Sequence, residues 1–281
     1  MYKMIAIDLD GTLLNDEKEI SEENIFWIRK AYIERGVLPV VTTGRSIPST
    51  VHYANMIGQD MTKYVISQNG AIVKDVINNE YINFIKIEND TVTKAIKILK
   101  SNNLSISIES DKYVIFEEEQ TEEQMEMHEK LGNRIKVVDD LSEYDTSDDR
   151  ITMVSGAGEK EDLLNVLAKL EEFKDILVIP ISKYLAINGD NIYEEYYIEF
   201  TAAGATKGNG ITAVQKQLNI QNEEVIAIGD GGNDISMFEE GRIKVAMGNG
   251  AESLKQYADF VTTTNNEHGV AEVIKKYIFN M

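Results

Sequence analysis

Two aspartates near the N-terminus, Asp8 and Asp10, lie in the segment DLDGT directly after the apolar run Met4–Ile7. Side chains two residues apart on a strand point to the same side, so both carboxylates would reach one point if the strand continued to Asp10. An ionised carboxylate can attack a phosphorus atom without a base to activate it. A second carboxyl group can protonate the leaving oxygen and later activate water. The alternative for this segment is an ordinary Asp-Gly turn after a strand.

A third carboxylate, Asp230, follows another apolar run, Val225–Ile228, in the segment GDGGND. Carboxylates close together repel each other, and a phosphate dianion adds to the charge, so the pattern requires a cation. Mg²⁺ prefers oxygen ligands and takes few of them from the protein. Asn233 and Asp234 stand where the next helix would begin, placed to orient their neighbours and to cap that helix. Taken alone, the segment also fits a Gly/Asp loop with a helix cap.

A bound phosphate also needs hydrogen-bond donors, and two further segments supply them. Thr43 and Gly44 follow the apolar run Val37–Thr42 and precede a helical pattern, where a hydroxyl and backbone N–H groups suit an anion. Lys207 starts another helical pattern and offers a point positive charge. Each of these residues alone also fits a structural role. Arg45 could form a salt bridge instead of binding substrate, and we do not assign it to the site.

The residues with this chemistry follow the strands of a repeating strand–helix pattern. The N-terminal segment alternates strands and helices at Met4–Ile7, Ser21–Arg35, Val37–Thr42, Ile47–Ile57 and Tyr64–Ser67. The C-terminal third, from the helical pattern at Lys207–Leu218 onward, repeats this alternation. It predicts an α/β fold with a doubly wound parallel sheet, in which ligands bind at the carboxyl ends of the strands. Pro39 cannot donate to a strand ladder, so we expect it near a strand start or at an edge.

The middle of the chain has a different pattern, in which helical segments separate paired strands such as Ser105–Ile108 and Tyr113–Phe116. Paired short strands indicate an antiparallel sheet, and the helices between them indicate a small α+β domain. The sequence therefore predicts a core made of residues 1–83 and 203–281. A second domain, residues 84–202, is inserted into it.

The composition excludes several classes of partner and site. The chain has 281 residues, with 48 acidic and 28 basic side chains, and its net charge of −20 disfavours nucleic acid and anionic membranes. It has no cysteine, which removes thiol nucleophiles and Cys-ligated metals, and its three histidines lack HExxH spacing. The N-terminal apolar run is broken by aspartates, and no stretch approaches the roughly 20 apolar residues of a membrane span. We expect a cytoplasmic protein, and the sequence leaves its oligomeric state open.

Taken together and in this order, the four segments resemble the haloacid dehalogenase (HAD) superfamily of phosphatases. The shared signature is DxDGT, a Ser/Thr after the second strand, a Lys, and GDxxND. The position of the insertion is similar to that of the cap domain in the Cof-like, class IIB branch. Further similar features are the segments Gln68–Ala71, Val245–Asn249 and His268–Val270.

The resemblance implies a role for each matching residue. Asp8 would be the nucleophile and form an aspartyl-phosphate, and Asp10 would be the general acid/base. Three aspartates would hold Mg²⁺: Asp8, Asp10 (also through its backbone carbonyl) and Asp230. Four residues would bind the transferring phosphoryl group: Thr43, the backbone of Gly44, Lys207 and Asn233. Asp234 would support Lys207 or the waters of the metal, and the cap would set the choice of substrate.

The function expected from these observations is Mg²⁺-dependent hydrolysis of small phosphomonoesters, such as sugar phosphates or similar metabolites. One alternative is a phosphotransferase or phosphomutase on the same scaffold, because only the acceptor differs. Another is a metabolite-binding regulator without turnover, although such a protein has no need of a paired nucleophile and acid. The charge excess lies mainly in residues 84–202, which hold 27 acidic and 13 basic side chains. We expect most of these acidic groups to face solvent.

Overall fold

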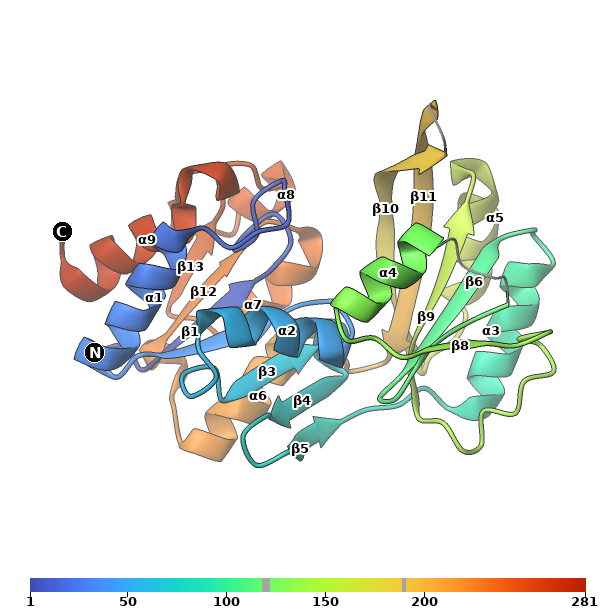
Figure 1. Cartoon of the computed structure of the whole chain (residues 1–281), viewed down its shortest axis with the longest axis horizontal. Helices are drawn as coiled ribbons and strands as arrows, with labels where there is room; N and C mark the ends of the chain where they lie inside the picture. Colours follow the sequence, from blue (N-terminus) through green and yellow to red (C-terminus); the bar gives the residue numbers. More distant parts are fainter. Residues whose placement is uncertain (118–121, 189–190) are drawn as a thin grey trace. The chain divides into compact units, whose positions relative to one another are not determined.

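The computed structural model describes residues 1–117, 122–188 and 191–281. The chain forms two compact units, which are coloured along the sequence in Figure 1. Unit 1 comprises Met1–Phe84 and Thr206–Met281, and unit 2 comprises Ile85–Ala205. No helix among the described residues combines the length and the apolar character needed to cross a membrane.

Unit 1 contains an eight-stranded sheet in the described residues, in the order β14-β13-β12-β1-β2-β3-β4-β5. The strands are β1 Met4–Asp8, β2 Leu38–Thr42, β3 Tyr64–Ser67, β4 Ile72–Asp75, β5 Glu80–Phe84, β12 Val225–Gly229, β13 Ile243–Ala246 and β14 Phe260–Val261. The six strands from β14 to β3 pair in parallel, whereas β4 and β5 are antiparallel additions at one edge. The predicted parallel sheet is confirmed, and the hairpin of β4 and β5 is a feature that the sequence pattern did not predict.

Pro39 lies at the second position of β2, a central strand, and not at an edge. Leu38 N–H donates to the Lys3 carbonyl on the β1 side, so the next residue along the strand faces β3. Pairing with β3 begins only at Val41. The missing N–H of Pro39 therefore costs no ladder hydrogen bond, and the expectation of a place near the strand start is confirmed.

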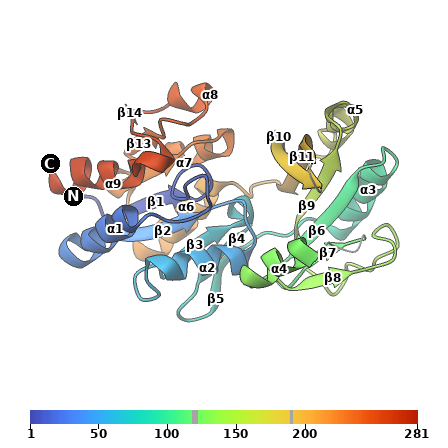
Figure 2. The same ribbon diagram turned by 45° about the horizontal axis from the view of Figure 1, so that its top comes forward.

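Helices cover both faces of the unit 1 sheet. They are α1 Glu22–Arg35, α2 Ile47–Ile57, α6 Lys207–Leu218, α7 Ile235–Glu239, α8 Glu252–Lys255 and α9 Gly269–Ile274, which continues as a π-helical turn over Lys275–Phe279. Side chains of α6, α7 and α8 pack in one core with alternate strand residues such as Met4 and Ala6. The intervening residues Ile5 and Ile7 are equally buried on the opposite face. In Figure 2, α1 and α9 lie side by side, as their contacts also show. The doubly wound arrangement is confirmed.

Unit 2 contains a six-stranded sheet in the described residues, in the order β10-β11-β9-β6-β7-β8. The strands are β6 Ser105–Ser110, β7 Val114–Phe116, β8 Ile135–Val137, β9 Ile151–Gly158, β10 Ile176–Asn188 and β11 Asn191–Ala202. All pairs are antiparallel except β7 with β8. The predicted α+β character is confirmed, whereas the parallel strand β8 was not predicted.

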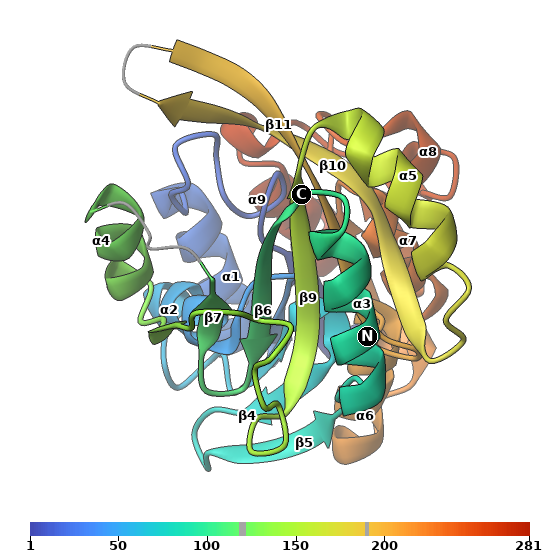
Figure 3. The same ribbon diagram turned by 90° about the vertical axis from the view of Figure 1, so that its right-hand side faces the viewer.

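The helices of unit 2 are α3 Asn89–Lys100, α4 Glu122–Lys130 and α5 Lys160–Leu170. Figure 3 shows α3 and α5 together on one side of the sheet, and their side chains share a hydrophobic core with β6, β9 and β11. This core includes Leu99, Leu163 and Phe200, all fully buried. Unit 2 thus has a core of its own.

Candidate active site

Four neighbouring strands of unit 1 bring the predicted site residues to one edge of the sheet. Asp8 is the last residue of β1, Thr43 follows β2, and Asp230 follows β12. The strands β12, β1 and β2 are adjacent and parallel, so their carboxyl ends meet. The next strand, β3, ends beside them and leads into the short 3₁₀ turn Gln68–Gly70. This is the edge at which an open α/β sheet binds ligands.

Lys207 is the buried centre of the site. Its ammonium Nζ lies 2.6 Å from Asp8 Oδ1 and 2.6 Å from Asp234 Oδ1, and the residue is only 2% exposed. Burial alone would lower its pKa, but the charges of Asp234 and Asp8 raise the pKa above the usual lysine value. Lys207 therefore stays charged and holds both carboxylates. It is the first residue of α6, whose N-cap Thr206 accepts a hydrogen bond from Asn209 N–H.

Three carboxylates gather around this ammonium. Oxygens of Asp8, Asp230 and Asp234 all lie within 4.8 Å of one another. Asp234 Oδ2 also accepts hydrogen bonds of 2.9 Å from the N–H groups of Asp230 and Gly231. Gly11 borders the same group, because a Cβ there would lie 2.3 Å from Asp230 Oδ2. When all three are ionised, the group carries two negative charges beyond that of Lys207, and a divalent cation would balance them.

This crowding raises two of the carboxyl pKa values. Burial raises the pKa of Asp8 well above its usual value against the opposing effect of Lys207, and the charges of Asp234 and Asp230 add to the rise. Burial and the charge of Asp234 raise the pKa of Asp230 to about 6. Removal from water and like charge both disfavour the ionised form. A bound cation would reverse this preference.

Asp10 lies outside the group of three carboxylates found in the described residues. The strand β1 ends at Asp8 and the chain turns at Leu9, so the expectation of an extended path to Asp10 is wrong. Arg45 donates from Nε and Nη2 to the two Asp10 oxygens, at 2.7 Å each, and Lys18 Nζ donates at 3.0 Å. Burial would raise the pKa of Asp10, but Arg45 and Lys18 together lower it to about 2. Asp10 is therefore ionised here.

The sequence indicated one of the two cationic partners of Asp10 and not the other. Arg45 forms the salt bridge that the sequence left open as its alternative role. The sequence did not indicate Lys18 as a partner. This residue lies in a loop, has a left-handed backbone with φ 62°, and its side chain reaches Asp10. The position of the Lys18 side chain depends on this turn, and the spacing of residues in the sequence does not predict it.

The predicted phosphate-binding residues surround Asn69, a residue without a predicted role. Asn69 N–H donates to the Thr43 carbonyl at 3.0 Å, and Asn233 Nδ2 donates to Asn69 Oδ1 at 3.0 Å. A Cβ on Gly44 would lie 3.0 Å from Asn69 Nδ2. The only signal for Asn69 in the sequence was its place in the family-like segment Gln68–Ala71. The Thr43 hydroxyl accepts from Arg45 N–H at 3.2 Å.

The turn that carries Asn69 has an unusual backbone. Gln68, Asn69 and Gly70 have φ values of 48°, 53° and 95°, three left-handed residues in succession. Such a conformation costs roughly 1–2 kcal/mol for a residue with a Cβ, and strain of this kind is often found at functional sites. Gly70 is required by space as well, because a Cβ there would lie 2.0 Å from the Thr206 carbonyl oxygen. The turn thus packs directly against the start of α6.

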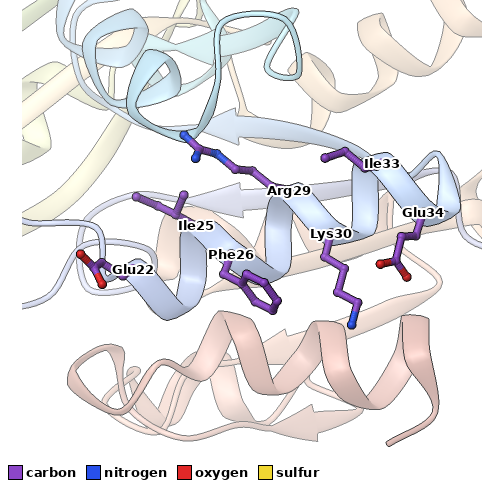
Figure 4. A pocket seen from close by; sticks show the side chains of 7 residues that line it. All are labelled: Glu22, Ile25, Phe26, Arg29, Lys30, Ile33 and Glu34. Atoms are coloured by element: carbon purple, nitrogen blue, oxygen red, sulfur yellow. The ribbon is translucent and has the colours of Figure 1, made fainter.

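A groove of about 600 Å³ lies elsewhere in unit 1, along α1. Figure 4 shows that all the side chains lining it come from this one helix, among them Phe26, Arg29 and Ile33. It contains none of the residues assigned above.

Comparisons with known proteins identify the family of this chain. A family model described as haloacid dehalogenase-like hydrolase matches residues 5–274. Phosphatase YwpJ of Bacillus subtilis strain 168 is 32% identical, over 97% of this chain and 99% of its own. The protein named 5-amino-6-(5-phospho-D-ribitylamino)uracil phosphatase YcsE, from the same organism, is 30% identical, over 98% of this chain and 96% of its own.

A solved structure shares the fold over nearly the whole chain. The crystal structure of a haloacid dehalogenase-like hydrolase from Bacteroides thetaiotaomicron has a TM-score of 0.81 and 28% identity, and the match covers 98% of this chain and 99% of that one. The family model and the curated relatives extend over both units. The resemblance predicted from the sequence is confirmed: the chain belongs to the haloacid dehalogenase-like hydrolases and is a phosphatase of that family.

Proposed function

We propose that the protein hydrolyses small phosphomonoesters with Mg²⁺ as cofactor, through an aspartyl-phosphate formed on Asp8. The observation that carries this proposal is the buried Asp8–Lys207 pair, 2.6 Å between charged atoms, at the ligand edge of the sheet. A lysine in this place can neutralise an attacking carboxylate and an incoming phosphoryl group together. The family membership supports the same reaction class.

In the first half-reaction, an Asp8 oxygen forms a bond to phosphorus while the ester P–O bond breaks. The electron pair leaves with the alcohol oxygen, which takes a proton from the Asp10 carboxyl. In the second half-reaction, water attacks the phosphorus, Asp10 takes its proton, and the Asp8–phosphorus bond breaks to release orthophosphate. Thr43, the Gly44 N–H, Lys207 and Asn233 hold the phosphoryl oxygens throughout.

Asp10 must change partners to serve in both halves. Its carboxylate is paired with Arg45 and Lys18, which keep its pKa at about 2 and favour the base form. Acting as an acid requires the leaving oxygen to replace at least one of these cations. Arg45 would then be available to the substrate, so the pair of charges couples binding to the protonation of Asp10.

Three residues would hold the metal: Asp8 and Asp230 through their carboxylates, and Asp10 through its backbone carbonyl. Their chemistry fits Mg²⁺, because they offer only oxygen and the carboxylate group carries an excess of two negative charges. When bound, Mg²⁺ would neutralise this charge and polarise a phosphoryl oxygen. Asp234 would keep Lys207 in place and, through its other oxygen, fix the loop that carries Asp230.

The proposed substrates are sugar phosphates and chemically similar metabolites in the cytoplasm. The relative YcsE is named for a uracil derivative that carries a phosphorylated ribityl chain, which is also a small phosphomonoester. This compound therefore belongs in a substrate panel beside hexose and pentose phosphates. We assign the choice among them to unit 2, the inserted domain.

The proposal is tested by release of orthophosphate from p-nitrophenyl phosphate with and without Mg²⁺, followed by the substrate panel. Asp8→Asn should abolish turnover, by a factor on the order of 10⁴ or more. Asp60→Asn is the matched control, because Asp60 is exposed and lies outside the site. Activity of the Asp8→Asn variant at the wild-type level would refute the assignment of the nucleophile. Transfer of phosphate between sugar positions without release of orthophosphate would favour a phosphomutase instead.

A further inference from the structure

Asn69 is a buried polar residue at the site to which the mechanism above gives no role. It is only 3% exposed, and it follows β3 at the same edge of the sheet as Asp8 and Thr43. Its side-chain oxygen accepts the hydrogen bond from Asn233 Nδ2. Its side-chain Nδ2 is buried and has no hydrogen-bond partner in the described part of the chain. A buried N–H donor without an acceptor is costly, and native proteins rarely retain one without a reason.

The surroundings of this donor are those expected of a residue that binds a phosphoryl group. Asn69 Nδ2 is 3.0 Å from the place where a Cβ on Gly44 would lie, so the amide rests directly over the Gly44 backbone. On the other side of the amide, Asn69 Oδ1 accepts the hydrogen bond from Asn233 Nδ2. Gly44 and Asn233 are two of the four residues assigned to the phosphoryl group. The free donor thus lies between two groups that the proposed function assigns to one anion.

The backbone around Asn69 fixes this position. Asn69 N–H binds the Thr43 carbonyl at 3.0 Å, and Gln68 N–H binds the Arg45 carbonyl at 2.9 Å. Gly70 packs against the Thr206 carbonyl, one residue before Lys207. The left-handed conformation, φ 53°, is one that Asn tolerates better than most residues. The fold thus holds the Asn69 side chain next to the segments that carry Thr43, Lys207 and Asn233.

From this juxtaposition we infer that Asn69 is a further phosphate-binding residue, whose Nδ2 donates a hydrogen bond to the phosphoryl group of the substrate. The inference rests on the proposed function, since it names one more ligand of the same group. It gives the buried donor the acceptor that it lacks. It also explains why Asn233 is bound to a second amide: Asn69 Oδ1 orients Asn233 Nδ2 while Nδ2 faces the anion.

The experiment measures the affinity for orthophosphate by calorimetry in the presence of Mg²⁺, and separately kcat and KM for p-nitrophenyl phosphate. Asn69→Gly keeps a residue suited to positive φ and removes the donor, and we expect binding about 10- to 100-fold weaker. Asn69→Asp keeps an acceptor for Asn233 but places a negative charge beside the anion, so the loss should be larger. Asn219→Gly and Asn219→Asp are matched controls. Asn219 has the same φ of 53° at the exposed end of α6, and its variants should bind orthophosphate like the wild type.

The outcomes separate the inference from the proposed function. If the Asn69 variants bind orthophosphate within twofold of the wild type while only their melting temperatures fall, Asn69 is structural and the inference is wrong. If the wild type binds orthophosphate and the Asn69 variants do not, yet no ester is hydrolysed, the inference stands and the proposed function fails. Should the variants not fold, NMR of the wild type decides. The side-chain amide resonances of Asn69 should shift on saturation with orthophosphate while those of Asn219 stay, and unshifted Asn69 resonances would overturn the inference.

Discussion

At the scale of single residues, the site depends on one ammonium group buried among carboxylates. A charge removed from water is stabilising only when it is paired, and removing one partner of a buried pair leaves the other uncompensated. Lys207 has two partners at 2.6 Å, and Asp234 has three donors in Lys207 and two backbone N–H groups. The arrangement therefore links the proposed catalysis to stability, because the same lysine would serve both.

Replacing Lys207 by Met should lower the free energy of unfolding by about 3–5 kcal/mol near pH 8, because Asp8 and Asp234 would be left buried without their cation. The loss should be smaller near pH 5, because without Lys207 the pKa of Asp8 rises further and the carboxyl becomes neutral. Urea denaturation at the two pH values measures this. Lys216→Met, on the exposed face of the same helix, should change stability by less than about 0.5 kcal/mol. Equal losses in the two variants would contradict the role of Lys207.

Asp230 makes the stability of the metal-free protein depend on pH. Its pKa is about 6 in the folded state and near 3.8 when unfolded, so the folded protein binds more protons between these values. The free energy of unfolding should therefore fall as pH rises from about 4 through 6. Mg²⁺ binds the ionised carboxylates, so its stabilising effect should be larger at pH 8 than at pH 5. Denaturation with EDTA or saturating Mg²⁺ tests this, and Asp230→Asn should remove most of the difference. An equal effect of Mg²⁺ at both pH values would be evidence against this site.

The sequence predicted which segments come together at this edge of the sheet better than it predicted the contacts between their side chains. Asp8, Thr43 and Asp230 could be placed together because each follows an apolar strand, and parallel strands end at one edge. The ion pairs of Asp10 and the contacts of Asn69 depend on left-handed turns at Lys18 and at 68–70. Such turns are set by tertiary packing, and neither Lys nor Gln signals a positive φ. Residue spacing therefore predicts which strands meet, and not which side chains bind across loops.

At the scale of elements, the turn at 68–70 and the start of α6 behave as one structure, because Gly70 leaves no room for a side chain beside the Thr206 carbonyl. Gly70→Ala should destabilise the protein by about 2–5 kcal/mol, since the left-handed backbone and the steric clash add. It should also lower turnover, because the clash displaces the residue next to Lys207. The measurements are urea denaturation and hydrolysis of p-nitrophenyl phosphate.

Gly36→Ala provides the matched control for the backbone cost. Gly36 ends α1 with φ 67°, and a Cβ there would meet nothing within 4 Å. This variant should lose only about 1–2 kcal/mol and keep its turnover. A similar loss in the two variants would mean that the close approach of the turn to α6 contributes nothing.

A helix or strand could be predicted where the spacing of its apolar residues and the residues at its ends indicate the same element. Helix α1 begins after Ser21, whose hydroxyl accepts from Asn24 N–H, and it ends at the left-handed Gly36. The sequence pattern predicted a helix over the same segment, Ser21–Arg35. The hairpin β4–β5 was not predicted, because its turn relies on Asp75 accepting from Ile77 and Asn78 and on a left-handed Asn79. Strand β10 is a single long strand, although its pairing with β11 shifts register between Ile179 and Ser182.

At the scale of the whole molecule, chemistry and charge are divided between the two units. All seven residues assigned to catalysis, metal and phosphate binding lie in unit 1, as do the supporting residue Asp234 and Asn69. The inserted segment 84–202 carries the larger acidic excess, with 27 acidic and 13 basic side chains. Since unit 2 has its own hydrophobic core, selection can change its surface without disturbing the residues to which we assign phosphoryl transfer.

This division predicts the result of separating the units. In unit 1, β5 packs against α6, so a short Gly/Ser linker from Phe84 to Thr206 should preserve the fold. The linked unit 1 should hydrolyse p-nitrophenyl phosphate within about tenfold of the intact protein, because the groups that act on phosphorus are all present. The ratio of kcat/KM for a metabolite ester to kcat/KM for the aryl ester should fall towards one, because unit 2, to which we assign the choice of substrate, is absent. Circular dichroism and thermal melting would establish folding of the linked unit and of residues 85–205 alone. A linked unit 1 that folds and binds orthophosphate but does not turn over the aryl ester would mean that unit 2 supplies a group for the chemistry itself.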